Sequence, residues 1–185
     1  MKYLLSLALA FALVGCATLS QLSVYTVSST ELEQVLDGQI SQLQKQTSLA
    51  GIPLTLDVED MTVSIGPDGR DVVHLGAIAT ARVSALGLNY PAKVSLALEG
   101  TPYYDSEEKA IFVRSLSLLD STIDAGGFKG NLAPVSGELM QLINGFLATN
   151  PVYRLDATNK AISLLSTVPL QLTVEQGQLA LRPKQ

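Results

Sequence analysis

The chain has 185 residues, of which 47% are hydrophobic and 16% charged, and its mean hydropathy is +0.30. This length and composition fit one folded domain with a sizeable core and exclude a mainly disordered chain. A formal net charge of −5 argues against nucleic-acid binding. One Cys, one His and no Trp exclude a Cys/His metal site and an internal disulfide.

The N-terminal segment has the features of a bacterial lipoprotein signal peptide. Lys2 gives a positive start, and the uncharged apolar run Leu4–Val14 follows it. A membrane-spanning helix needs roughly 20 apolar residues, so this run is too short for one. The tetrad Leu13–Cys16 resembles a lipobox, in which the Cys thiol receives a diacylglyceryl group before cleavage. We therefore expect Cys16 to be the lipidated first residue of the mature protein.

This cleavage site predicts the domain organisation. We expect residues 1–15 to be the signal peptide, residues 16–21 to be the lipidated Cys and a short tether, and residues 22–185 to form one domain. Acyl chains anchor a protein durably without a basic surface. Ala17 follows the Cys, where an Asp would resemble an inner-membrane retention signal. We therefore expect an anchor in the inner leaflet of the outer membrane, facing the periplasm.

Hydrophobic spacing predicts a helix, a long meander of strands and a second helix. A capping box at Ser28–Glu31 begins the first helix, which should run to about Gln46. Short links between long alternating runs favour an antiparallel sheet, with a bulge near Asp60, whose dry face the helices cover. The fold class is therefore α+β. The other expected elements are strands over 22–27, 53–65, 71–86, 93–100 and 110–119, helices over 132–148 (after an Asn131 cap) and 158–166, and a hairpin over 170–181.

Polar candidates for a functional site are few. His74 has no second His nearby in the sequence, and we interpret it as a strand residue on the polar face. Asp57, Glu59 and Asp60 could bind Ca²⁺ weakly, form a solvated strand edge or pair for acid–base chemistry, and we prefer the solvated edge. No segment matches a phosphate loop or a nucleophile elbow. We therefore expect no enzyme activity, no metal and no cofactor.

Small side chains on one strand are the most informative feature. Ala77, Ala79, Ala81 and Ala85 occupy the apolar face of the strand over 71–86, where a core strand usually carries Val or Ile. A helix packed tightly on these residues is the preferred explanation. The alternative is a groove kept open for an acyl chain, because a binding cavity must be apolar and underfilled. The candidate groove residues on the strand and both helices are Leu36, Ile40, Ala77, Ala79, Ala81, Leu139, Leu142, Ile143 and Phe146.

Five short motifs are spread over nearly the whole chain: the lipobox at Cys16, Tyr25–Val27, Pro102–Asp105, Lys109–Val113 and Pro151–Leu155. Together they resemble the YceB-like family of bacterial lipoproteins. That family is a domain of unknown function whose fold looks like the tubular lipid-binding (TULIP) superfamily, in which a curved antiparallel sheet wraps a long helix around an apolar channel. The resemblance implies a long curved meander packed on or wrapped around amphipathic helices, and it suggests lipid handling. It supplies no catalytic or binding residues.

Two functions follow as hypotheses. The first is a membrane-anchored, non-catalytic lipoprotein that binds a lipid, a fatty acid or another apolar ligand between its sheet and its helices. The second is an envelope interaction protein with a filled core, which docks a protein partner through an exposed strand edge or a loop at Tyr103–Tyr104. Bound lipid favours the first function, and a dry core with a protein partner favours the second.

Overall fold

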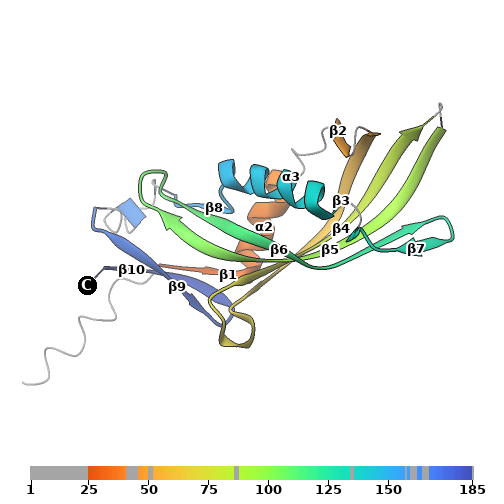
Figure 1. Cartoon of the computed structure of the whole chain (residues 1–185). Coiled ribbons are helices and arrows are strands. Elements are labelled where there is room, and N and C mark those ends of the chain that lie inside the picture. Colours follow the sequence, from red (N-terminus) through yellow and green to blue (C-terminus); the bar gives the residue numbers. More distant parts are fainter. Residues whose placement is uncertain are drawn as a thin grey trace, which may run out of the picture.

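Two antiparallel sheets and two helices make up most of the chain that the structure, a computed structural model, describes. Figure 1 shows the larger sheet curled into a half-barrel, with α3 (Ser136–Thr149) over its inner side. The α+β class and the long antiparallel meander expected from the sequence are confirmed. The described residues are 25–40, 46–49, 52–85, 88–133, 136–156, 158, 162–163 and 167–184.

The larger sheet is a meander in which consecutive strands pair side by side. Its four central strands have 13 to 18 residues, and strand twist accumulates over that length, which explains why the sheet curls. The expected bulge is confirmed at Glu59, where the pairing passes from Val58 to Asp60. The strands are β2 (Gln46–Leu49), β3 (Ile52–Ile65), β4 (Val73–Ala85), β5 (Leu88–Asp105), β6 (Ala110–Ala125) and β7 (Phe128–Gly130), with β8 (Tyr153–Arg154) paired to β6.

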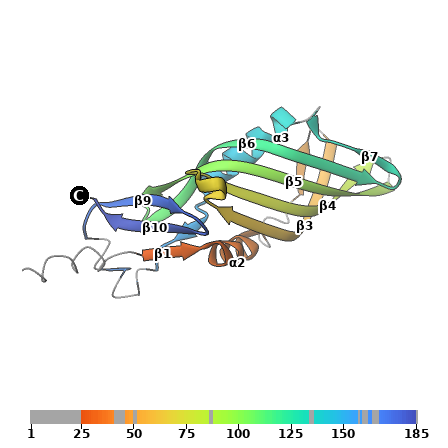
Figure 2. The same cartoon turned by 90° about the horizontal axis from the view of Figure 1, so that it is seen from below.

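The smaller sheet has the order β1-β10-β9 and lies at one end of the half-barrel, as Figure 2 shows. Its strands are β1 (Tyr25–Ser28), β9 (Leu170–Glu175) and β10 (Gln178–Pro183), which confirms the predicted opening strand and closing hairpin. Val27 on β1 and Leu179 and Leu181 on β10 are fully buried. The short 3₁₀ helix η2 (Pro67–Gly69) follows β3 at the same end. We call this end of the molecule the closed end.

The first helix, α2 (Ser29–Ile40), begins where the capping pattern predicts. The Glu31 backbone N–H donates to Ser28 Oγ at 3.2 Å, so Ser28 is the N-cap. The Glu31 carboxylate accepts a hydrogen bond from the Tyr153 hydroxyl at 2.6 Å, and so it ties α2 to β8. α2 packs against β3, and α3 packs against β6.

We expect Ser28→Ala to lower the free energy of unfolding by about 1 kcal/mol, because it removes the acceptor for a helix N-terminal N–H. Urea denaturation followed by circular dichroism measures the change. Ser28→Asp keeps an acceptor and should retain the stability of the natural protein. Ser64 is exposed on a strand, and Ser64→Ala should lower the free energy of unfolding by less than half as much. An equal loss in Ser64→Ala would contradict the capping role of Ser28.

Several predicted boundaries are wrong. The first helix ends at Ile40 rather than near Gln46, because Gln46–Leu49 form β2 and pair with the start of β3. Strand β5 continues through Gly100 to Asp105. A side chain on Gly100 would overlap Val113, so this glycine allows close strand packing instead of ending the strand.

The C-terminal half shows similar differences. β6 runs to Ala125 rather than Leu119, because an irregularity in its pairing with β5 lets the strand continue. α3 begins at Ser136 rather than residue 132. Asn131 does not cap it, because its side-chain Oδ1 accepts from the Ala133 N–H at 3.1 Å in a local turn. Most of the helix expected over 158–166 lies outside the described residues.

Candidate functional site

The inner face of the half-barrel is apolar along its central strands. Ala77, Ala79 and Ala81 lie on this face of β4, as predicted; Ala79 is 5% and Ala81 9% exposed. On β5, Val94 pairs with Ala79 and Ala92 pairs with Ala81. We call these five residues the alanine patch. The cross-strand rows that lead to it from the closed end are Ile65–Val73–Gly100, Val63–Leu75–Leu98 and Met61–Ala77–Leu96.

The main hydrophobic core lies toward the closed end of the same face. It includes Leu36 from α2 and Leu147 from α3, both buried. Val94 is only 7% exposed but does not belong to this cluster. The alanine patch therefore extends the apolar face beyond the main core. The Ile40 side chain lies outside the described residues.

The predicted groove residues on α3 differ in their burial. Ile143 and Phe146 are half-buried and pack against the main core. Leu139 is half-buried, and Leu142 is 46% exposed. The apolar side of α3 is therefore wider than the part that contacts the main core, because Leu139 and Leu142 lie outside that contact. The structure brings Leu36, Ile143 and Phe146 to one core, which does not include Leu139 or Leu142.

A hollow of about 380 Å³ lies between β6 and the first turn of α3. Its wall contains the buried Ser121, whose Oγ accepts a hydrogen bond from the Leu132 N–H at 3.1 Å. Ser121 pairs with Leu96, which pairs with Ala77, so the hollow adjoins the alanine patch across β5. The residues that line it are Leu118, Leu119, Asp120, Ser121, Asn131, Ala133, Gly137 and Met140.

Sequence reasoning did not predict this hollow. Leu119 is left out of the pairing between β5 and β6, in which Leu118 and Asp120 take part. Two leucines in succession interrupt the apolar–polar alternation at this point, which is the only local signal of the irregularity. The spacing of hydrophobic residues in the sequence does not predict that α3 packs against this part of β6.

The outer face of the sheet is polar and carries His74. His74 Nε2 lies 2.8 Å from Glu99 Oε2 and 3.1 Å from Arg70 Nη2. The hydrogen bond to His74, with help from Arg70, holds the pKa of the Glu99 carboxyl below its usual value. His74 is therefore part of a charge-paired surface cluster, which agrees with its predicted place on the polar face.

The three carboxylates near the bulge are part of the same polar face. Glu59 accepts a hydrogen bond from the Thr80 hydroxyl at 2.5 Å, and this bond lowers the pKa of the Glu59 carboxyl. Asp57 lies 3.7 Å from Arg82 in an ion pair. Asp60 is exposed. Within the described ranges, no group of three or more His, Cys, Asp or Glu side chains could hold a metal ion.

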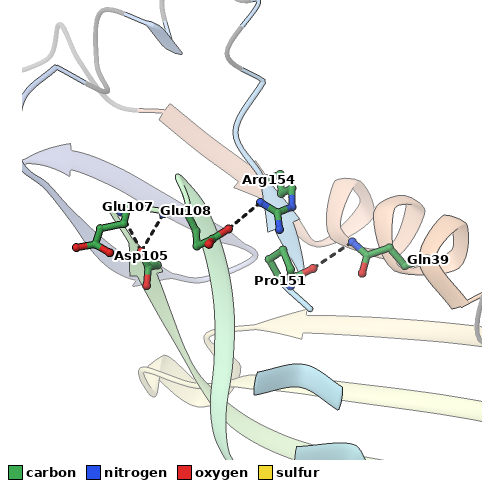
Figure 3. A network of polar contacts seen from close by, with 6 residues as sticks. All are labelled: Gln39, Asp105, Glu107, Glu108, Pro151 and Arg154. Carbon is green, nitrogen blue, oxygen red and sulfur yellow. Dashed lines mark hydrogen bonds and ion pairs between the residues drawn. The ribbon is translucent and has the colours of Figure 1, made fainter. Parts of the chain in front are cut away.

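The segment 151–155, which follows α3, is hydrogen-bonded to α2 and to the turn between β5 and β6. The Gln39 amide donates to the Pro151 carbonyl at 3.1 Å, and Arg154 donates to Glu108 at 3.2 Å (Figure 3). Asp105 Oδ1 accepts from the Glu107 and Glu108 N–H groups and thereby shapes the turn between β5 and β6. The segment therefore connects α2 to this turn.

Tyr153 is the centre of a second polar cluster at the closed end. Its hydroxyl donates to Glu31 and is hydrogen-bonded to the Tyr25 hydroxyl. Burial, followed by these two partners, raises the pKa of Tyr153. The motifs that carry the family resemblance at Tyr25–Val27 and Pro151–Leu155 meet here, 128 residues apart at their tyrosines. They hold the fold together rather than lining the alanine patch.

Tyr103 and Tyr104 do not form a loop, which corrects the prediction of a docking loop there. Both lie in β5, opposite Phe112 and Ile111 of β6. The Tyr103 ring stacks on Phe112 at 5.7 Å between centroids, and Arg114 lies 5.1 Å from the Tyr103 ring centre. Cross-strand stacking of this kind stabilises a strand position, which explains why the pair is part of the sheet.

Cys16 and the proposed signal peptide lie outside the described residues. Among the helices that the structure describes, none is long and apolar enough to cross a membrane.

Comparison with known proteins identifies the family. The chain is 25% identical over 171 residues to the uncharacterized lipoprotein YceB of Salmonella typhimurium, covering 91% of this chain and 90% of the relative. It is 26% identical over 155 residues to the uncharacterized lipoprotein YceB of Escherichia coli, covering 82% and 81%. The family described as a protein of unknown function (DUF1439) matches residues 27–178. The chain therefore belongs to the DUF1439 family.

Proposed function

We propose that this protein is a lipid-anchored lipoprotein of the bacterial cell envelope that binds an acyl chain or another apolar ligand on the inner face of its half-barrel, without catalysis. The observation that carries the proposal is the alanine patch. Four of its five side chains are alanines, which take up less room than the Val or Ile usual in a core strand, and the patch extends the apolar face beyond the main core. An acyl chain needs an apolar surface that neighbouring side chains do not fill.

Burial of the ligand would supply its affinity. About 25 cal/mol is gained for each Å² of apolar surface removed from water. The half-buried Leu139 and the exposed Leu142 would form the opposite, helical wall of the binding groove. No ionic group is required, which agrees with the apolar character of the cross-strand rows.

The relatives support the location. Two of them are named lipoproteins, and the Leu13–Cys16 tetrad of this chain, which resembles a lipobox, supports lipid attachment at Cys16. We propose the inner leaflet of the outer membrane, because Ala17 rather than Asp follows the Cys. The curled sheet with helices on its inner side is also the arrangement that a TULIP-like lipid carrier would need.

Native mass spectrometry tests the proposal. A form that begins at Ala17, secreted through an ordinary signal peptide and purified gently from a bacterial periplasm, should carry one phospholipid or fatty acid. Lipid extraction identifies the class. Delipidated protein should take up added phospholipid in a one-to-one ratio.

A bare protein mass with no lipid uptake would overturn lipid binding. The alternative is then a membrane-tethered module that docks an envelope protein. Phe128, the first residue of β7, is 65% exposed and offers an apolar contact for that role. A protein partner captured by the wild type and lost in Phe128→Ser would support the alternative.

A further inference from the structure

Two exposed aromatic residues mark the end of the half-barrel opposite the smaller sheet. Tyr90, near the start of β5, is 55% exposed, and Phe128, at the start of β7, is 65% exposed. Figures 1 and 2 show both strand segments at this end, away from β1, β9 and β10. We call it the open end. Exposed apolar side chains that gather in one place are typical of a surface that contacts a partner or a membrane.

Both aromatic side chains belong to the inner face of the sheet. Side chains alternate between the two faces along a strand, so Tyr90 shares the face of Val94, a member of the alanine patch. Val94 pairs with Ile123 of β6, which pairs with Gly130 of β7. The Phe128 ring lies over Gly130, since a Cβ built on that glycine would be 3.0 Å from two carbons of the ring. The two aromatic residues therefore continue the apolar face from the alanine patch to the open end.

The charged groups near the open end lie on the outer face and are paired. Lys93 is opposite Asp124, which is opposite Lys129. Lys129 forms an ion pair with Asp124 at 3.6 Å, and Lys93 forms one with Glu59 at 3.7 Å. The open end thus has aromatic side chains on one face and neutralised charges on the other. Aromatic side chains are enriched at membrane–water interfaces, so this distribution suits contact with a bilayer surface through aromatic rings rather than through charge.

The lipid anchor determines which bilayer is within reach. Cys16 lies nine residues before Tyr25, where β1 begins at the closed end, so at about 3.5 Å per residue the tether spans at most roughly 30 Å. Strand β5 has 18 residues, which at about 3.3 Å per residue extend over roughly 60 Å. Because the tether is shorter than the sheet, the open end meets the anchoring membrane only when the half-barrel lies along the bilayer.

We infer that the open end docks on the surface of the membrane in which the protein is anchored, with Tyr90 and Phe128 inserted at the interface. The inference rests on the proposed function, since it needs the anchor at Cys16 and gives an acyl chain a route from the bilayer onto the alanine patch. The closed end is filled by buried side chains such as Val27 and Leu179. The open end is where the apolar face is exposed. Because charge does not drive the contact, added salt should leave it in place.

Tryptophan fluorescence tests the docking in the full-length, acylated protein, reconstituted into phosphatidylcholine vesicles. The chain contains no Trp, so Tyr90→Trp, Phe128→Trp and Val168→Trp each introduce a single reporter. Val168 is the matched control, because it is 43% exposed beside the smaller sheet, where the Lys184 N–H donates to the Pro169 carbonyl. Phosphatidylcholine brominated on its acyl chains quenches a Trp that reaches the acyl region. We expect quenching and a blue shift of the emission for the reporters at the open end, at low and high salt, and neither for Val168→Trp.

A lipid bound on the alanine patch would also quench a reporter at the open end, and Ala81→Leu separates the two sources. The added leucine is expected to displace bound lipid without changing the open end. Quenching of Phe128→Trp should therefore persist in the Ala81→Leu background. Quenching that disappears in this background would overturn docking and leave lipid binding standing.

Other outcomes would overturn docking as well. Unquenched emission at both aromatic positions would show that the open end stays in water, and equal quenching at all three positions would show that this end is not preferred. Unquenched, blue-shifted emission that increases with the protein content of the vesicles would show that a second copy of the chain covers the aromatic residues. Lipid uptake by the secreted form is measured without an anchor, so its failure overturns the proposed function and is distinguishable from a failure of docking.

Discussion

Gly66→Ala is expected to lower the free energy of unfolding by about 3 kcal/mol, because strain and a steric clash act together. Gly66 has a φ of +63°, in the left-handed region that an alanine adopts only at a cost. A Cβ there would lie 2.7 Å from the backbone oxygen of Glu175. Relief requires the turn between β9 and β10 to move away from the end of β3. Urea denaturation followed by circular dichroism measures the loss.

Gly69→Ala is the matched control for this prediction. Gly69 has a φ of +71°, but a Cβ there would meet no atom within 4 Å. Gly69→Ala has the backbone strain of a positive φ without a steric clash, so its free energy of unfolding should fall by about 1 kcal/mol. Equal losses in the two variants would show that the contact between the sheets is loose.

The difference in stability between Gly66→Ala and Gly69→Ala measures how tightly the two sheets pack at the closed end. The Gly177 N–H donates to the Ile65 carbonyl at 2.9 Å, and the Gly177 carbonyl accepts from the Ser29 N–H at 3.2 Å. The turn between β9 and β10 is therefore held between β3 and the start of α2. This contact is remote from the alanine patch. Lipid uptake should survive in Gly66→Ala at temperatures where the variant is folded.

Local spacing was sufficient for much of the fold. Period-two alternation identified β3 and β4, and it placed Ala77, Ala79 and Ala81 together on one face, because side-chain direction in a strand is fixed by position. The N-cap at Ser28 was equally predictable, since its chemistry involves residues three apart. These features depend on near neighbours alone.

Features set by distant partners could not be predicted. In the sequence, Gly100 resembles the end of a strand, but it lies inside β5. A glycine is needed there because the Val113 side chain of the neighbouring strand leaves no room for a Cβ. The bond between Tyr25 and Tyr153 joins residues 128 apart. The hollow at Asp120 needs α3 to return to β6, and nothing in the spacing of either segment specifies that contact.

Ala81→Leu is expected to reduce bound lipid by at least about tenfold, a change of about 1.4 kcal/mol in binding free energy. The larger side chain would occupy the space that the ligand needs on the inner face. Native mass spectrometry of the secreted form, with and without added phospholipid, measures the loss. Ala79→Leu, one row nearer the closed end, should have the same effect.

The stability of the same variant distinguishes an open groove from a filled core. If the alanine patch borders an underfilled groove, the added leucine fills it, and the free energy of unfolding should stay equal or rise by about 0.5–2 kcal/mol. If a helix packs tightly on Ala81, the leucine overpacks the core and should cost about 1–3 kcal/mol. Ala97→Leu, on the outer face of β5, controls for the change in side-chain size. Loss of stability in Ala81→Leu, with lipid uptake absent from the wild type, would identify the patch as packed core and leave protein docking as the function to pursue.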